Sequence, residues 1–68
     1  MRLKSIRLEK NLTQKQIADA LGLSTMAIQH YENNRRKPTY DTLIALADYF
    51  NVSMDYIAER TNNPKINT

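Results

Sequence analysis

The sequence has no cysteine, and it has only one histidine and one glycine. Without cysteine there is neither a disulfide framework nor a thiolate metal site, and a single histidine cannot form a metal site alone. The single glycine also excludes the glycine-rich loops that hold nucleotide phosphates. We therefore expect no metal, no cofactor and no disulfide. The lack of cysteine also fits a cytoplasmic location, where thiols stay reduced.

Long apolar runs are missing as well. No stretch approaches the roughly 18–20 apolar residues that a membrane-spanning helix needs. The first seven residues mix charged with apolar side chains, and no apolar segment follows them, so we expect no signal peptide. Neither a membrane protein nor an exported protein is expected.

Signals of an enzyme are also absent. Asp55 and Glu59 lie four residues apart, but no positioned base, nucleophile or phosphate loop accompanies them. We interpret both as solvated helix residues and expect no catalytic residues. No small-molecule ligand site is evident in the pattern either.

The charge is modest in total but unevenly distributed. The 68 residues carry a net charge of +3. Residues 1–37 hold eight Lys and Arg against three Asp and Glu, a net of +5, whereas residues 38–68 hold two against four, a net of −2. A domain with this polarity is expected to turn its N-terminal half toward a polyanion.

Apolar residues recur at helical spacing in five short segments. They predict helices over residues 2–10, 14–21, 25–32, 40–50 and 54–59. The clearest amphipathic stripe belongs to the fourth and consists of Leu43, Leu46, Ala47 and Phe50. We expect an all-α, compact bundle of five short helices in one domain, residues 1–61, followed by a C-terminal tail, residues 62–68.

Residues 13–33 combine two short helices with a tight turn. Thr13 and Ser24 can each cap a helix, because a hydroxyl oxygen accepts from a free backbone N–H in the first turn. Gly22 follows the last apolar residue of the first helix, where a left-handed residue is needed. Two capped helices joined by a turn with glycine are typical of a helix-turn-helix motif.

The second helix of the motif has two different sides. Ile28 and Tyr31 are spaced to face inward. The outward side is uncharged over its first turn, and a cationic run, residues 35–37, follows it. Such side chains beside cations suit base edges flanked by phosphates. A purely structural helical corner would need neither feature.

These residues resemble a known family. The stretch TQKQIADALGLSTMAIQHYEN, followed by RRKP, is similar to the Cro/repressor-type (XRE family) helix-turn-helix transcriptional regulators of phages and bacteria. The similarity extends from about residue 3 to residue 61. It implies a lambda-repressor-like DNA-binding domain and a sequence-specific regulator that binds double-stranded DNA at the nucleoid. Repression of a phage or mobile-element type is the commoner role in the family.

The resemblance assigns base contacts to the helix that enters the major groove. The matching positions are Thr25, Met26 and His30, with Gln29 close by. Met26 departs from the family, because many relatives have a polar residue there. Its other interpretation is partial packing beside Leu23, and that of His30 is a solvated side chain.

Phosphate contacts are expected around the motif. Gln14 opens the first helix, where its backbone N–H and its amide can reach a phosphate oxygen. The other candidates are polar or cationic: Ser24, Asn33, Arg35, Arg36 and Lys37. The alternative for the three cations is a solvated charge run.

The family also often joins an Arg of the first helix to the Glu of the YEN-like segment. Arg7 and Glu32 match these positions, and such an ion pair would orient the two helices. A domain this small makes few DNA contacts, so we expect a homodimer on a near-palindromic operator with half-sites about 34 Å apart. Its interface is expected from the fifth helix and the tail, with Tyr56, Ile57 and Ile66 as the candidate residues.

Two other functions remain open. One is a protein-interaction module of the antirepressor kind, which would have no salt-sensitive affinity for DNA. The other is an antitoxin, which would share the DNA-binding domain and differ by a co-encoded partner.

Overall fold

The computed structural model describes residues 1–61, 63 and 64. This part of the chain forms the helices α1 (Leu3–Glu9), α2 (Gln14–Leu21), α3 (Thr25–Glu32), α4 (Tyr40–Phe50) and α5 (Met54–Ile57), and it contains no strand. The expected all-α fold is confirmed. None of these helices is both long and apolar enough to span a membrane. Within the expected tail, residues 62 and 65–68 lie outside the described residues.

The bounds of α2, α3 and α4 match the expectation, but the first and last helices are shorter than predicted. In α1, Arg2 and Lys10 are the flanking caps. The expected end of α5 near residue 59 is wrong, because the helix stops at Ile57 and the backbone turns left-handed at Glu59, with a φ of 65°. Backbone N–H groups just beyond the helix close the turn, with that of Arg60 donating to the carbonyl of Asp55 at 2.7 Å.

Hydroxyl side chains begin four of the helices in the described chain. Thr13 accepts from the backbone N–H of Gln16 at 3.0 Å, and the Gln16 side chain accepts from the backbone N–H of Thr13 at 2.7 Å. This reciprocal pair is a capping box, and it satisfies two backbone donors at once. The other caps are Ser24, Thr39 and Ser53.

Left-handed residues lie at or just after the ends of several helices. Gly22 has a φ of 68° at the end of α2, where glycine adopts the conformation without a Cβ clash. Asn51 ends α4 with a φ of 56°. After α3, Asn34 is left-handed with a φ of 59°, whereas Asn33, the residue that ends the helix, has a φ of −92°.

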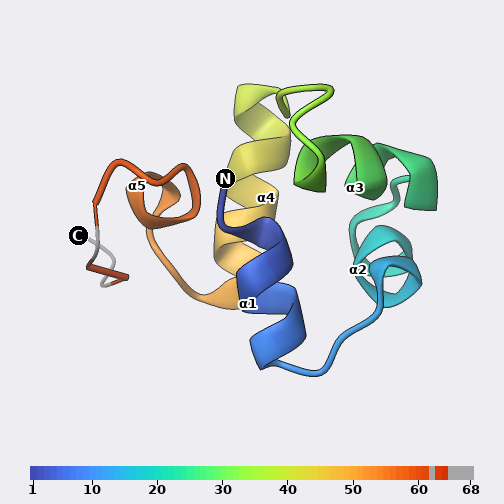
Figure 1. Ribbon diagram of the computed structural model, residues 1–68, viewed down its shortest axis with the longest axis horizontal. Coiled ribbons are helices and arrows are strands. Elements are labelled where there is room, and N and C mark those ends of the chain that lie inside the picture. The colour runs from blue at the N-terminus through green and yellow to red at the C-terminus, as the bar shows by residue number, and fades with distance from the viewer. Residues whose placement is uncertain (62, 65–68) are drawn as a thin grey trace.

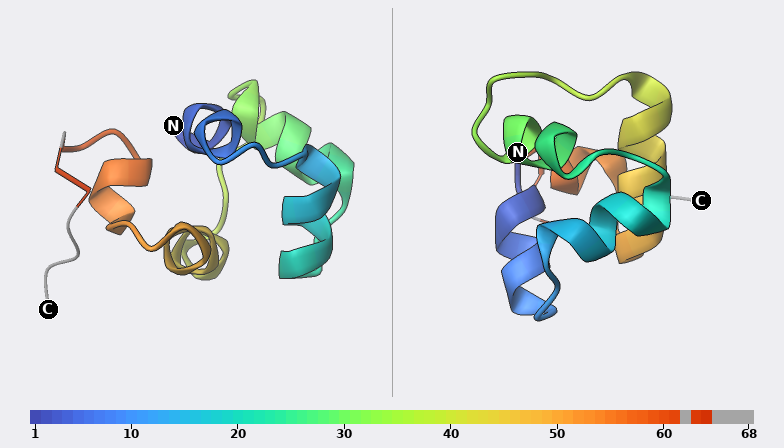
Figure 2. Two further views of the ribbon diagram at one scale, coloured as in Figure 1. Left: turned by 90° about the horizontal axis from the view of Figure 1, so that it is seen from below. Right: turned by 90° about the vertical axis from the view of Figure 1, so that its right-hand side faces the viewer.

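The core takes one fully buried aliphatic side chain from each helix. These residues are Leu3, Ile17, Ile28, Leu46 and Ile57, each with 0% of its surface exposed. Figures 1 and 2 show α4 with α2 and α3 on one side and α5 on the other, and α1 beside it. The five side chains therefore hold all the helices around one small core.

The first residues of the chain hold α5 in place. The backbone N–H of Arg2 donates to the carbonyl of Ile57 at 2.8 Å, and its guanidinium donates to the carbonyls of Tyr56 and Thr61. The same guanidinium lies 4.6 Å from the centroid of the Tyr56 ring. The expectation that Ile57 contributes to a dimer interface is wrong, because it is buried in the core, and Ile66 lies outside the described residues.

Candidate nucleic-acid interface

The turn between α2 and α3 fixes the orientation of α3 relative to α2. The backbone N–H of Leu23 donates to the carbonyl of Ala18 at 2.8 Å, which closes the turn around Gly22. Ala18 is 1% exposed, and its small side chain allows α2 and α3 to approach closely. Figure 2 shows α3 beside α2 on one side of the molecule.

The two sides of α3 differ as the sequence pattern predicts. Ile28 and Tyr31 are buried, and they anchor the helix to the core. On the opposite side Gln29 is exposed and Met26 has 62% of its surface exposed, so the alternative of partial core packing for Met26 is not what the structure shows.

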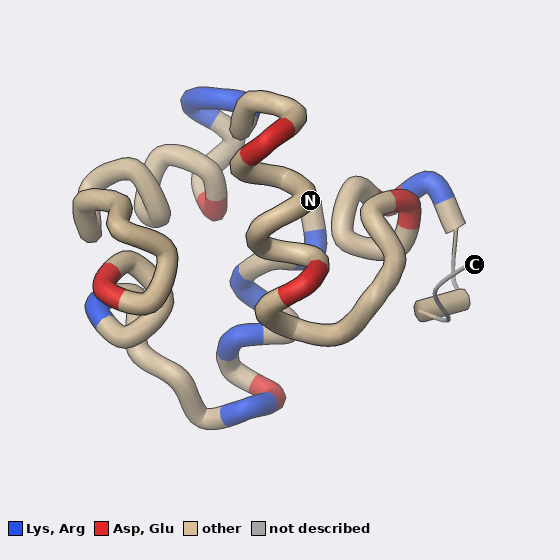
Figure 3. Tube along the Cα trace, turned by 180° about the vertical axis from the view of Figure 1, so that it is seen from behind, with Lys and Arg blue, Asp and Glu red and all other residues tan. Residues whose placement is uncertain are grey.

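Thr25 and His30 are half-buried and complete the outward surface of α3. Figure 3 shows that this helix carries no Lys, Arg, Asp or Glu before Glu32. The four candidate base-contacting residues therefore come together on one helix. They form a surface of three polar side chains and one apolar side chain, Met26, with no Lys, Arg, Asp or Glu among them.

A buried ion pair fixes the other end of α3. The guanidinium of Arg7 binds both carboxylate oxygens of Glu32, with N–O distances of 2.6 and 3.1 Å, and also donates to the carbonyl of Leu12 at 2.9 Å. Only 2% of the Glu32 side chain and 11% of the Arg7 side chain are exposed. The pair joins α1, the link to α2, and α3, so it determines the tilt at which α3 is held.

Gln14 belongs to this cluster, which sequence reasoning missed. Its amide nitrogen donates to Glu32 at 3.0 Å, so the amide points toward the ion pair. The first N–H groups of α2 have no acceptor within their own helix and remain the better donors to an anion. No short sequence signal links residues 14 and 32, since the contact depends on how α2 and α3 pack.

Ser24 has a divided role. Its oxygen accepts from the backbone N–H of Ala27 at 3.1 Å and so caps α3. The side chain is exposed, and its hydroxyl hydrogen can still be donated to an outside acceptor. The same atom can thus begin the helix and bind a phosphate.

The loop after α3 presents the candidate cations. Asn33, Arg35, Arg36 and Lys37 are all exposed. Backbone N–H groups of Arg35 and Arg36 donate to the carbonyl of His30, at 2.8 and 3.4 Å, which folds the loop back onto the end of α3. Figure 3 shows the loop cations at the C-terminal end of α3.

The surface of α2 adds one exposed ion pair. Lys15 donates to the carboxylate of Asp19 at 2.8 Å, and this hydrogen bond, with the negative charge of Asp19, raises the pKa of Lys15 above its ordinary value. Lys15 therefore remains protonated over the physiological range. Because it is paired, it offers less free positive charge than the loop does.

Known proteins match most of the chain. A family model described as "Helix-turn-helix" matches residues 3–57. The chain is 41% identical over 64 residues to the "Uncharacterized HTH-type transcriptional regulator YqaE" of Bacillus subtilis (strain 168), covering 94% of this chain and 55% of YqaE. It is 36% identical over 66 residues to the "HTH-type transcriptional regulator ImmR" of the same organism, covering 97% of this chain and 52% of ImmR.

A third relative has a name that refers to a phage. The chain is 36% identical over 59 residues to the "Cryptic phage CTXphi transcriptional repressor RstR" of Vibrio cholerae serotype O1 (strain ATCC 39315 / El Tor Inaba N16961), covering 87% of this chain and 53% of RstR. The chain thus spans about half the length of the curated relatives that it matches. No solved structure matches it at a significant level.

Proposed function

Because this chain belongs to the helix-turn-helix family, we propose that it is a transcriptional regulator that binds double-stranded DNA in a sequence-specific way. The observation that carries the proposal is the outward surface of α3, where Met26 and Gln29 are exposed, Thr25 and His30 are half-buried, and a loop of three exposed cations follows. Base edges present hydrogen-bond donors and acceptors between two rows of phosphates, and this surface has the complementary arrangement.

In the proposed complex the N-terminal part of α3 enters the major groove. The amide of Gln29 has both donors and an acceptor, so it can form paired hydrogen bonds with one base. Thr25 offers a hydroxyl and a methyl group, and His30 can donate to guanine or to a phosphate. Met26 is apolar and exposed, which suits contact with a thymine methyl group.

The phosphate contacts frame this helix. On one side they come from the start of α2, at Gln14, and from the hydroxyl of Ser24. On the other side they come from the loop, through Asn33, Arg35, Arg36 and Lys37. Contacts of this kind hold the protein on the duplex whatever its sequence, and they release bound counterions, so the affinity falls as salt rises.

We further propose that the regulation is repression of a phage or mobile-element type. RstR, one of the relatives, carries the name of a phage repressor. A bound regulator that covers a promoter excludes the polymerase from it. One domain of this size reads one half-site, so we propose that two copies bind a near-palindromic operator.

Selection of bound sequences from a random duplex pool, at a stated salt concentration, tests the proposal. We expect an enriched near-palindromic sequence, with half-sites about one helical turn apart, and an affinity that falls steeply with salt. A scrambled duplex of the same composition is the control. If no sequence is enriched and retention on DNA does not respond to salt, the chain is instead a protein-interaction module.

A further inference from the structure

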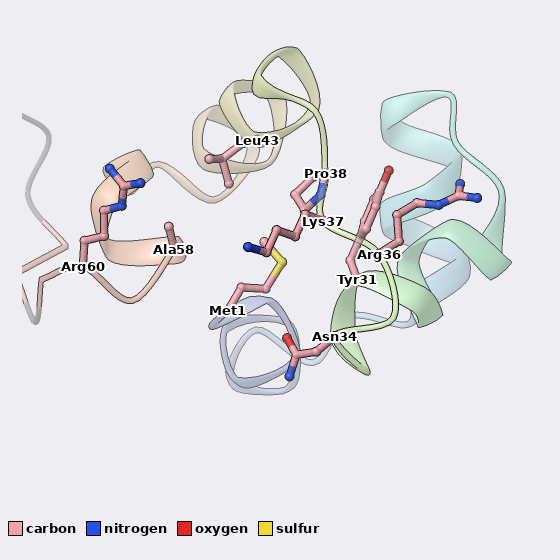
Figure 4. A pocket seen from close by; sticks show the side chains of 9 residues that line it. All are labelled: Met1, Tyr31, Asn34, Arg36, Lys37, Pro38, Leu43, Ala58 and Arg60. Carbon is pink, nitrogen blue, oxygen red and sulfur yellow. The ribbon is translucent and has the colours of Figure 1, made fainter.

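A hollow of about 420 Å³ lies between the loop after α3, the start of α1, α4 and the end of α5. Figure 4 shows Leu43 directed into it from α4, with Met1 and Ala58 on facing sides. Its size lies within the range of small-molecule sites in proteins. Segments far apart in the sequence build it, so no sequence pattern indicates it.

The walls of the hollow combine apolar groups with positive charge. Met1, Pro38, Leu43 and Ala58 provide the apolar part, and all four are at least partly buried. Cations come from the loop and from the end of α5. Among the described residues, no Asp or Glu lines it, so the charged side chains of its walls are all positive. The carboxylate of Glu59 lies beside it and pairs with the amino terminus of Met1 at 3.3 Å.

The cations are not engaged elsewhere. In the described part of the chain, Lys37 and Arg60 take part in none of the ion pairs, and both are exposed. Figure 4 shows Lys37 extended from the loop with its amine between Met1 and Ala58, and Arg60 on the α5 side. Arg36 also lines the hollow, but its guanidinium turns away toward α3.

We propose that this hollow binds a small amphipathic anion, that is, an aromatic or aliphatic body with one sulfonate, carboxylate or phosphate group. Apolar walls remove the body from water, and unpaired ammonium and guanidinium groups hold the anionic group through charge-assisted hydrogen bonds. A neutral molecule would lack the charge-assisted hydrogen bonds, and an inorganic anion would lack the burial of apolar surface. The proposed site therefore selects for both properties in one molecule.

Occupation of the hollow should also weaken binding to DNA, a step that rests on the proposed function. Lys37 is both a wall of the hollow and a candidate phosphate contact, and Arg36 adjoins both sites. An anion held by Lys37 neutralises a charge that a phosphate would otherwise use. The hollow would then act as an effector site through competition for one cation, without any change of shape.

The first test titrates the unmodified chain with 8-anilinonaphthalene-1-sulfonate, an aromatic sulfonate whose fluorescence rises in apolar surroundings. We expect one molecule bound per chain, and weaker binding of N-phenyl-1-naphthylamine, which lacks the sulfonate. Backbone amide shifts in an NMR titration should move mainly at residues 34–43 and 58–60. Shifts that are spread over the whole chain, or confined to α2, would overturn the proposal without any mutation.

Variants then separate charge from shape. Lys37→Gln and Arg60→Gln should each lower the affinity for the sulfonate by about two- to fivefold, the range for an exposed ion pair. Lys10→Gln removes the same charge outside the hollow and should leave the affinity unchanged. Ala58→Leu fills the hollow and should abolish binding although no charge is lost. Thermal unfolding of each variant shows that it is folded, and equal affinities in all four variants would contradict the site.

The competition test uses a duplex enriched from the random pool. Saturating sulfonate should raise the Kd for this duplex in the unmodified chain but not in Ala58→Leu, at an ionic strength matched with sodium chloride. If the Kd stays constant while the probe is bound, the effector role is wrong. If no duplex binds even without the probe, the proposed function fails, and the titrations above still decide whether the hollow is a binding site.

Discussion

At the scale of single residues, the buried carboxylate of Glu32 is the group that depends most on its hydrogen-bond donors. Its carboxylate is almost fully buried and accepts three hydrogen bonds, two from Arg7 and one from Gln14. A buried charge is tolerated only while such donors are present. The stability of the domain and the tilt of α3 therefore depend on the same cluster.

Replacement of Arg7 by Ala should destabilise the fold by about 3–5 kcal/mol, because it leaves a buried carboxylate without its partner. The measurement is the free energy of unfolding in urea. Since this loss approaches the whole stability of a small domain, Glu32→Gln, which keeps the shape of the side chain and one accepting oxygen, is the milder companion and should lose less. Lys15→Ala, which breaks an exposed ion pair, is the control, and an equal loss there would contradict the buried-pair argument.

Gly22 permits a cleaner test of backbone conformation. Among the described residues, apart from its two chain neighbours, no residue has an atom within 4 Å of a Cβ at this position, so the loss is attributed to the left-handed φ of 68°. Gly22→Ala should cost about 1–2 kcal/mol in the free energy of unfolding. Gly22→Asn should cost less, since asparagine tolerates this region better. If the two variants unfold at the same temperature, backbone strain is not the cause.

At the scale of elements, α3 and the loop after it are proposed to contribute differently to one complex. In the proposed complex, residues on α3 would face base edges, whereas the loop cations would face phosphates, and only the first kind of contact depends on sequence. A helix substitution and a loop substitution should therefore have different signatures, although both weaken binding.

Gln29→Ala should cost about 1–3 kcal/mol of discrimination at one base pair, the value of one paired hydrogen-bond contact. Arg35→Ala should weaken binding to all sequences about equally and lower the slope of log affinity against log salt by about one. Repeating the duplex selection with each variant measures both quantities. A change of preferred sequence in Arg35→Ala would show that the loop reads bases.

The bounds of the elements were predictable where a side chain marks them. Thr13 and Ser24 cap α2 and α3 at the expected positions, and Gly22 ends α2 as expected. The end of α5 was missed because its left-handed residue is Glu59, a type that rarely adopts this conformation and gives no local signal. The capping box of α2 was also predictable, because Gln16 lies three residues after Thr13, which is the spacing that this motif requires.

At the scale of the whole molecule, what the sequence could not predict lies between distant segments. From the sequence alone Arg2 would be taken for a surface cation, yet its guanidinium lies over the Tyr56 ring and donates to the Tyr56 carbonyl in α5. The hollow beside Lys37 depends in the same way on how α1, α4 and α5 meet. Local patterns specify helices and their faces, but contacts between residues some 50 positions apart need the packed structure.

The spacing of the two half-sites would have to fit the arrangement of two whole molecules on one operator. Each α3 of a two-fold dimer would enter the major groove on one face of the duplex, which requires half-site centres about 10 base pairs apart. Inserting about five base pairs turns one half-site to the opposite face. Affinity should then fall toward that of a single half-site. An insertion of a full turn should return both half-sites to the same face of the duplex, but at a larger separation than the dimer fits.

Electrophoretic mobility and light scattering on these duplexes measure affinity and the number of chains bound. The proposed dimer requires two chains on the unmodified operator and a clear loss of affinity for the half-turn insertion. Because Ile57 is buried, a contact between copies would have to use other side chains, so Ile57→Ala should reduce stability without selectively removing the second chain. Two chains bound with equal affinity at every spacing would mean independent monomers, and each α3 would then act alone on its half-site.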